Sequence, residues 1–148
     1  MARFRFAPAP DVARDMGRLV EVLDLNHIDR ERVHCRRSWG STADIYARIW
    51  ELPSIWQEAL NVRPQYLIEV LAEHYDALDR AGRLKILIHE LLHIPRTFSG
   101  AVRGHRGQGE RIDDRTVERY FKRYRALGGH ADGTDRDGGQ MAIRFEKP

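Results

Sequence analysis

Apolar residues recur every three or four positions along two stretches of the chain, which is the spacing of a helix with one buried face. The first stretch predicts a helix from Asp11 to about Asp24, with Asp11 as its capping residue. The second predicts a helix that begins after Asp113 and Asp114 and ends at the glycine pair 128–129. The apolar positions of the two stripes are Val12, Met16, Leu19, Val20, Leu23, Val117, Tyr120, Phe121, Tyr124 and Leu127.

Between these helices, apolar and polar residues alternate, and this pattern predicts strands. The expected strands are 28–37, 45–50 and 66–71. A turn is expected at 38–41, and Pro53 is expected to open a short helix that ends near Leu60. Residues 1–10 contain two prolines and are expected to form an extended lead-in. Strands mixed with helices in this order indicate the α+β class, with a small mixed sheet.

The most chemically specific stretch is the apolar segment 86–95, which contains the motif His-Glu-x-x-His. It is expected to form the end of a helix that starts near Asp79 and stops at the proline of the segment. Residues four apart lie on one face of a helix, so His89 and His93 point the same way. Two such imidazoles can bind one metal ion, and Glu90 can reach a water on that metal without being a ligand.

Both histidines of the motif could instead be core residues satisfied by hydrogen bonds. However, leucine and isoleucine surround them on the helix, and a buried Glu90 without a partner would be costly. A bound dication removes that cost and uses both imidazoles, so the motif favours a metal site. The upstream residues His27, His34 and His74 have no partner at ligand spacing and are expected to lie at the surface or in local hydrogen bonds.

Catalytic zinc usually takes three protein ligands and leaves a fourth position to water, so the chain must supply one more ligand. The candidates are His105, Glu110 and Glu118. Glu118 lies on the last predicted helix, an arrangement found in zincins whose third ligand is a helical glutamate. His105 lies in a glycine-rich loop that can fold back over the metal, and zinc accepts nitrogen ligands well. His105 is therefore favoured over the two glutamates.

The composition is that of one globular domain, because 42% of the 148 residues are hydrophobic and 32% are charged. We expect the domain to cover 1–129 and the remainder, 130–148, to be a flexible tail in which 141–145 could add an edge strand. There is no apolar run of the ~20 residues that a membrane helix needs, and no signal-peptide pattern. Cys35 is the only cysteine, so a cytoplasmic location is expected. The net charge of +3 permits nucleic-acid contact without arguing strongly for it.

The run from His89 to Gly100, followed by His105, resembles a family of small metallopeptidases from archaea, bacteria and phages. The likeness covers roughly residues 28–125. Its upstream part is carried by Ala47-Arg48-Ile49-Trp50, Leu52-Pro53 and Tyr66 to Val70. One difference is that Gly104 stands where the family usually has proline, which leaves the rigidity of this loop open.

The resemblance implies a compact zincin-like domain, related in plan to the SprT-like proteases, in which the sheet packs against an active-site helix. It also implies metal ligands at His89, His93 and His105, and a general base at Glu90. Zn²⁺ is the expected cofactor.

We therefore predict a zinc-dependent peptidase that hydrolyses peptide bonds with a zinc-activated water and Glu90 as general base. Its partner would be a protein or peptide, bound as an added strand, with Tyr66–Val70 lining the cleft. Two alternatives stay open: a nucleic-acid-associated SprT-like protease that uses arginine-rich faces, and a non-catalytic zinc-stabilised binding domain. The sequence also offers Asp113 and Asp114 as acceptors for ligand imidazoles. Candidates for a second oxyanion donor are Tyr120, Tyr124 and Arg103.

Overall fold

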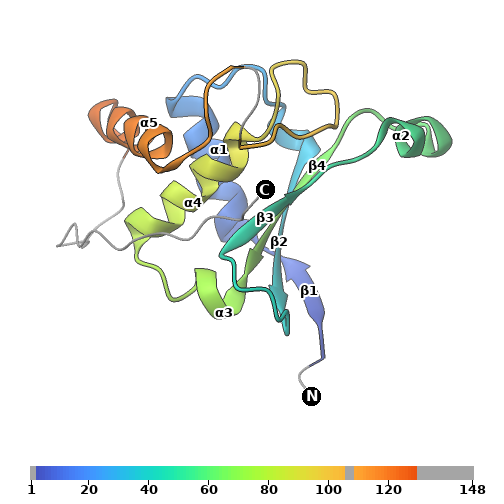
Figure 1. The fold of residues 1–148 in the computed structure, drawn as a ribbon, viewed down its shortest axis with the longest axis horizontal. Helices are drawn as coiled ribbons and strands as arrows, with labels where there is room; N and C mark the ends of the chain where they lie inside the picture. Colours follow the sequence, from blue (N-terminus) through green and yellow to red (C-terminus); the bar gives the residue numbers. More distant parts are fainter. Residues whose placement is uncertain (1–2, 106–108, 130–148) are drawn as a thin grey trace.

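The computed structural model describes residues 3–105 and 109–129, so the predictions for 130–148 lie outside the described residues. The helices and strands, in chain order, are β1 (Arg5–Pro8), α1 (Pro10–Val22), β2 (Val33–Trp39), β3 (Ala47–Trp50), α2 (Ser54–Leu60), β4 (Tyr66–Leu71), α3 (Ala72–Tyr75), α4 (Arg80–Leu92) and α5 (Asp114–Ala126). Figure 1 shows α1, α4 and α5 gathered on one side of the sheet, with α2 projecting at its far end. Among the described residues, no helix combines the length and the apolar composition needed to cross a membrane.

The four strands form one mixed sheet in the order β1-β2-β4-β3. β2 and β4 are parallel, whereas β1 and β3 run antiparallel to their neighbours. The predicted α+β class with a small mixed sheet is thus confirmed. β4 is paired on both sides, so the strand predicted to line the cleft is an inner strand and cannot accept another strand. On that side of the sheet, β3 forms the edge to which a further strand could add.

One face of the sheet packs against α1 and α4. Its central side chains, Tyr66, Ile68 and Val70, are almost completely buried. They alternate along β4 with residues of the other face, as the two-residue period of a strand requires. α4 is apolar and buried along most of its length, because it packs against the sheet, α1 and α5. This helix is therefore the central element of the core.

On the other face of the sheet, the side chain of Glu69 bonds to residues of the neighbouring strands. It is buried, with only 1% exposed. It accepts hydrogen bonds from Ser38 Oγ at 2.6 Å, Arg48 Nε at 2.9 Å and Trp50 Nε1 at 2.8 Å. Burial acts to raise the pKa of Glu69, but these donors outweigh it and lower the pKa below its usual value. Because the donors lie on β2 and β3, this one side chain links three neighbouring strands.

The observed N-terminal region differs from the prediction. Residues 5–8 of the expected lead-in form β1, which pairs with the end of β2, so β2 continues to Trp39 and the chain turns at Gly40 (φ 88°). α1 starts at Pro10, whose fixed φ suits the first turn of a helix, so Asp11 is not its cap. Asp11 instead accepts two hydrogen bonds from Arg37, at 3.0 and 2.9 Å. The short helix α3 was not predicted either, because four residues are too few to show a helical period.

Candidate metal centre

The motif helix α4 begins and ends as the sequence predicts. Asp79 caps its start, since the side chain accepts a hydrogen bond from the Gly82 backbone N–H at 2.7 Å. His93 is the residue that ends the helix, two positions before Pro95. His89 and His93 are 1% and 5% exposed, so both rings are packed in the core and shielded from solvent. The packing of α4 thus fixes the two imidazoles one turn apart.

A third imidazole joins them from the loop that follows α4. His89 Nε2 lies 3.0 Å from His105 Nε2 and 3.2 Å from His93 Nε2. The ring centroids of the three histidines are 4.7–5.0 Å apart. One nitrogen from each ring lies within 4.8 Å of the other two, so His89, His93 and His105 form a group that could hold a metal ion. We call these three residues the imidazole cluster.

The chemistry of these nitrogens fits a metal ion. His93 Nδ1 lies 2.5 Å from the Arg103 carbonyl oxygen, which can only accept, so Nδ1 carries the proton and Nε2 of the neutral ring presents its lone pair. Zinc binds imidazole nitrogen at about 2.0–2.1 Å, so two nitrogens of a tetrahedral site lie about 3.3–3.4 Å apart. The Nε2 separations from His89 to His105 and to His93, 3.0 and 3.2 Å, are close to that value. A divalent ion can therefore be bound with little change in the rings.

Burial of the cluster disfavours the charged form of all three rings. Burial is the main cause of the lowered pKa of His89, about 2, and the charged forms of His93 and His105 lower it further. Burial also lowers the pKa of His93, although its hydrogen bond to Arg103 opposes this, and it lowers the pKa of His105. Metal ions bind neutral imidazole, so burial of the cluster favours the form that a metal needs.

The loop between α4 and His105 is attached first to the sheet. The Tyr66 hydroxyl donates to the Ala101 carbonyl and accepts from the Gly100 N–H, both at 2.8 Å. Gly100 has φ +95°, and a Cβ there would lie 2.6 Å from the Leu52 carbonyl oxygen, so only glycine fits. Leu52 also donates from its backbone to the Gly100 carbonyl, at 2.9 Å. The start of the loop is thus fixed between β4 and the segment that follows β3.

Arg103 then returns the loop to the end of α4. Its backbone N–H donates to the His93 carbonyl at 2.7 Å, and its own carbonyl accepts from the ring of the same histidine. Its guanidinium donates to the backbone carbonyls of Leu92 and Glu110. Two residues further on, His105 reaches the cluster although glycine stands at position 104. These contacts fix the position of the chain immediately before Gly104.

The other candidate ligands, Glu110 and Glu118, and the three upstream histidines lie outside the imidazole cluster. Glu118 forms an ion pair with Lys85 at 2.9 Å, and the Glu110 carboxylate accepts from Tyr120 and pairs with Arg119, so neither glutamate joins the imidazole cluster. His27 lies 3.3 Å from the Ile94 carbonyl, His34 lies 2.8 Å from the Gln65 side chain, and His74 contacts the Tyr46 ring. Glu90 lies next to His89 on α4 and is 2% exposed.

The candidate supporting residues have the following contacts in the structure. Asp113 caps α5 through the Thr116 N–H, and the ring of His93 donates to the Arg103 carbonyl. Of the three candidate oxyanion donors, Tyr120 and Arg103 are engaged with Glu110 and Leu92, and Tyr124 is 1% exposed on α5. The positioning roles of Tyr66, Gly100 and Arg103 were missed, because backbone contacts leave no spacing signal in the sequence.

Comparison with known families identifies the family of the chain. The family described as "Putative phage metallopeptidase" matches residues 4–125, which include the sheet, α4, the imidazole cluster and nearly all of α5. No curated protein matches the chain, and no solved structure matches it.

Proposed function

The chain belongs to the family of putative phage metallopeptidases, and from this premise we propose a zinc-dependent peptidase with ligands His89, His93 and His105 and the general base Glu90. Family membership suggests a metal-dependent peptidase, and the three histidines could bind a metal ion. The observation that carries the finer proposal is the convergence of three imidazoles, one of them on the helix that also carries the buried residue Glu90 and one at the end of that helix.

Zinc is proposed because of the donor set. Three imidazole nitrogens with one position left for water are a ligand set of catalytic zinc, whereas Mg²⁺ and Ca²⁺ prefer oxygen. The hydrogen bond from His93 Nδ1 to Arg103 fixes the ring orientation and makes Nε2 a better donor. Such a contact beside a ligand histidine is usual in zinc sites.

A bound zinc ion supplies Lewis-acid chemistry: it lowers the pKa of water toward ~7 and polarises a peptide carbonyl. The residues of the chain supply the rest. The Glu90 carboxylate accepts a proton as the water oxygen bonds to the scissile carbonyl carbon. It then returns this proton to the amide nitrogen as the C–N bond breaks, so that the leaving group is a neutral amine. Such proton transfer contributes on the order of 10²–10⁴ to the rate.

The substrate is proposed to be an extended peptide bound along β3. This strand is an edge of the sheet and packs beside α4, so a peptide paired with it would lie along the motif helix. β-strand pairing uses backbone groups only, which gives affinity with little dependence on substrate sequence. Side-chain preferences would then come from the residues that flank β3.

The test is the substitution Glu90→Gln, which keeps the shape of the side chain and removes its basicity. We expect this variant to retain zinc and to cleave a dye-quenched casein at least about 100-fold more slowly than the wild type. Glu118→Gln is the matched control, because it removes a carboxylate on α5 that is paired with Lys85 outside the cluster. A Glu90→Gln protein that cleaves casein at the wild-type rate would refute the assignment. A wild-type protein that binds zinc and cleaves nothing would favour a zinc-stabilised binding domain.

A further inference from the structure

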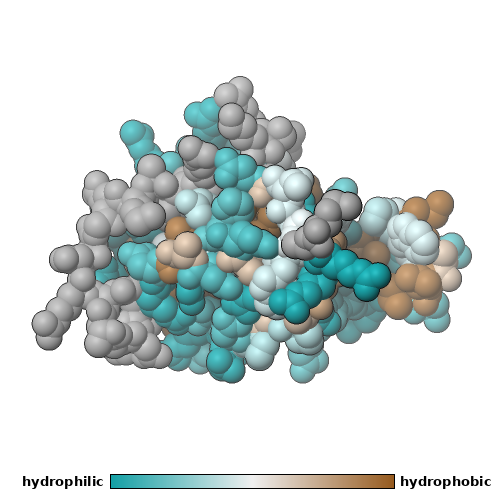
Figure 2. Space-filling model, turned by 90° about the horizontal axis from the view of Figure 1, so that it is seen from below, coloured by the Kyte–Doolittle hydropathy of each residue, from teal (hydrophilic) through white to brown (hydrophobic). Residues whose placement is uncertain are grey.

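Helix α2 stands apart from the rest of the fold, because none of its residues is buried. Its large apolar side chains are exposed, Ile55 by 73%, Trp56 by 56% and Leu60 by 57%. Figure 1 shows the helix projecting beyond the sheet, and Figure 2 shows hydrophobic side chains gathered at that end of the molecule. We call Ile55, Trp56 and Leu60 the α2 patch. None of the three belongs to the core, so packing within the chain does not explain them.

The orientation of α2 is the reverse of that of an ordinary surface helix, which turns its apolar side toward the protein. Successive helical residues are about 100° apart, so the α2 patch covers an arc of about 140° and Gln57 lies outside this arc. Gln57 attaches the helix, because its side-chain amide donates to the Leu52 carbonyl at 2.8 Å and to the Ser99 carbonyl at 2.9 Å. The helix is thus held through a polar side chain while its apolar side faces solvent. An exposed apolar surface of this kind is typical of an interaction site.

α2 is connected to both parts of the proposed substrate site. It follows β3, the proposed substrate strand, after the short segment 51–53. Gln57 bonds to Ser99, and the Leu52 N–H donates to the Gly100 carbonyl at 2.9 Å, so the base of α2 is joined to the loop that carries His105. His105 is five residues beyond Gly100, so at most about 18 Å of chain separates them. About six residues of an extended peptide span that distance.

The size of the α2 patch indicates a peptide as its partner rather than a second copy of the chain. At their exposed fractions, the three side chains offer roughly 400 Å², about half of the ~800 Å² that each partner contributes to a stable interface. An extended peptide needs less area, since its backbone can also pair with β3.

We propose that α2 binds large apolar side chains of the substrate, at positions several residues away from the scissile bond. The preferred substrate is then an unfolded protein segment that exposes leucine, isoleucine or phenylalanine. This inference rests on the proposed function, because it names the substrate class of the same site.

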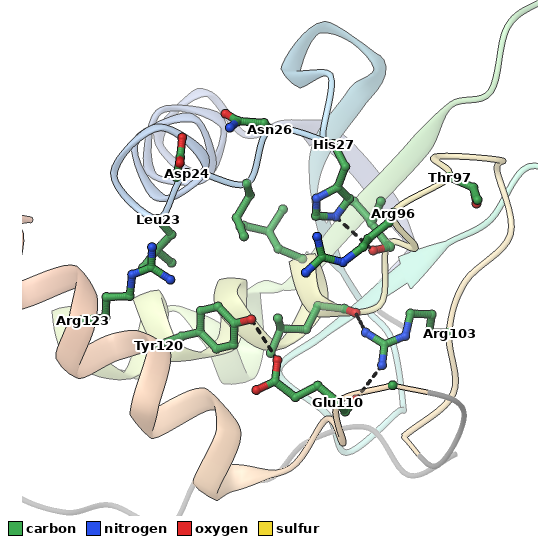
Figure 3. Close-up of a pocket in the computed structure, with 15 residues that line it drawn as sticks. Leu23, Asp24, Asn26, His27, Arg96, Thr97, Arg103, Glu110, Tyr120 and Arg123 are labelled. Carbon is green, nitrogen blue, oxygen red and sulfur yellow. Dashed lines mark hydrogen bonds between the residues drawn. The ribbon is translucent and has the colours of Figure 1, made fainter.

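A pocket near the end of α4, about 980 Å³ in volume, is another place where such side chains could bind. Figure 3 shows that charged side chains line it, among them Asp24, Arg96, Arg103 and Arg123. An apolar side chain there would cover charged groups without giving them hydrogen-bond partners, which costs free energy. The side chains of the α2 patch carry no charge and impose no such cost, so α2 is the better site for an apolar segment.

Fluorescence polarisation with two labelled peptides of about ten residues tests the proposal. One peptide carries leucine and phenylalanine at alternate positions, and the other carries serine there. The protein is the zinc-loaded Glu90→Gln variant, which under the proposed function leaves the peptides intact. The apolar peptide is expected to bind at least about tenfold more tightly than the serine peptide. Adding Trp56→Ser or Leu60→Ser should weaken its binding about tenfold, since each removes apolar contact area.

Leu127→Ser is the matched control, because Leu127 is exposed to nearly the same extent as Leu60, 56%, but lies at the end of α5. It should leave peptide binding unchanged. In the wild-type background, Trp56→Ser and Leu60→Ser should raise KM for the apolar peptide about tenfold. They should leave kcat and zinc content unchanged, because α2 contacts the substrate away from the scissile bond.

The proposal is wrong if both α2 variants bind the apolar peptide as Leu127→Ser does, or if the two peptides bind equally well. A wild-type dimer that Trp56→Ser dissociates, measured by light scattering, would mean that a second copy covers the patch. Lower zinc content and lower kcat at unchanged KM would mean that α2 only supports the loop. Peptide binding that depends on α2 in a wild-type chain that cleaves neither peptide would refute the peptidase and retain the binding surface, so the two proposals fail separately.

Discussion

The hydroxyl of Tyr66 holds the loop that delivers His105, and the substitution Tyr66→Phe removes that hydroxyl alone. Tyr66 is 1% exposed, and its oxygen makes two hydrogen bonds of 2.8 Å, to Ala101 and from Gly100. Ala101 is exposed, so its carbonyl can bond to water instead. Gly100 is buried, so its N–H would be left without an acceptor. A buried donor left without a partner costs about 1–3 kcal/mol, which is the destabilisation expected for Tyr66→Phe.

Part of this lost free energy should appear as a lower affinity for the metal, because the loop that is released carries His105. We expect urea unfolding of Tyr66→Phe to give a free energy about 1–3 kcal/mol below that of the wild type. We also expect competition with a chelator to give weaker zinc binding, by about tenfold for each 1.4 kcal/mol of loop free energy lost.

Tyr75→Phe is the matched control for this experiment. Tyr75 is also 1% exposed, but within the described residues its hydroxyl has no hydrogen-bond partner. Burial raises the pKa of Tyr75 above its usual range, as expected for a hydroxyl that is kept from water. Removing this group should leave stability unchanged or increase it, with no effect on zinc. If Tyr66→Phe and Tyr75→Phe give equal stability and equal zinc affinity, the proposed anchoring role of Tyr66 is wrong.

Three further predictions use other parts of the fold. Gly100→Ala should lower the free energy of unfolding by at least about 1 kcal/mol, as measured by chemical denaturation. Alanine is strained at the positive φ of this position, and its Cβ would collide with the Leu52 carbonyl oxygen. Glu69→Gln should destabilise the protein by about 3–5 kcal/mol, since it breaks a buried charged network; equal midpoints in urea would contradict this. The hydrogen bond from Arg37 lowers the pKa of Asp11 in the folded protein. The pair therefore stabilises the fold fully at a pH above the unfolded-state pKa of about 3.9, and this stabilisation is lost as the pH falls through the folded-state pKa. The stability gap between wild type and Asp11→Asn, about 1 kcal/mol or less, should therefore close in acid.

Local patterns predicted much of the fold because they depend on local physics. The run Tyr66–Leu71 is a strand in the structure, and the alternation in 45–50 corresponds to β3. The start of α4 at Asp79 and of α5 at Asp113 follows from the capping chemistry of aspartate. By contrast, the order of the strands was not predictable, because the pairing of β2 with β4 skips β3 in the sequence.

The sequence could predict only the part of the candidate site whose residues are close together in the chain. The four-residue spacing of the motif predicts that His89 and His93 share a face, and their Nε2 atoms lie 3.2 Å apart. The position of His105 was one of three open choices, because a loop has no period that fixes its path. The contacts that determine this path involve the backbone of Arg103 and the hydroxyl of Tyr66, which is far from the loop in sequence. Such contacts become visible only once the fold is known.

The most direct test of the central claim is the zinc content of the purified chain by elemental analysis, measured for the wild type, His105→Ala and Glu118→Ala. The account predicts one zinc ion per chain in the wild type and in Glu118→Ala, and little or none in His105→Ala. Zinc that is kept by His105→Ala and lost from Glu118→Ala, or a wild-type chain that takes up no zinc when it is supplied, would contradict the account.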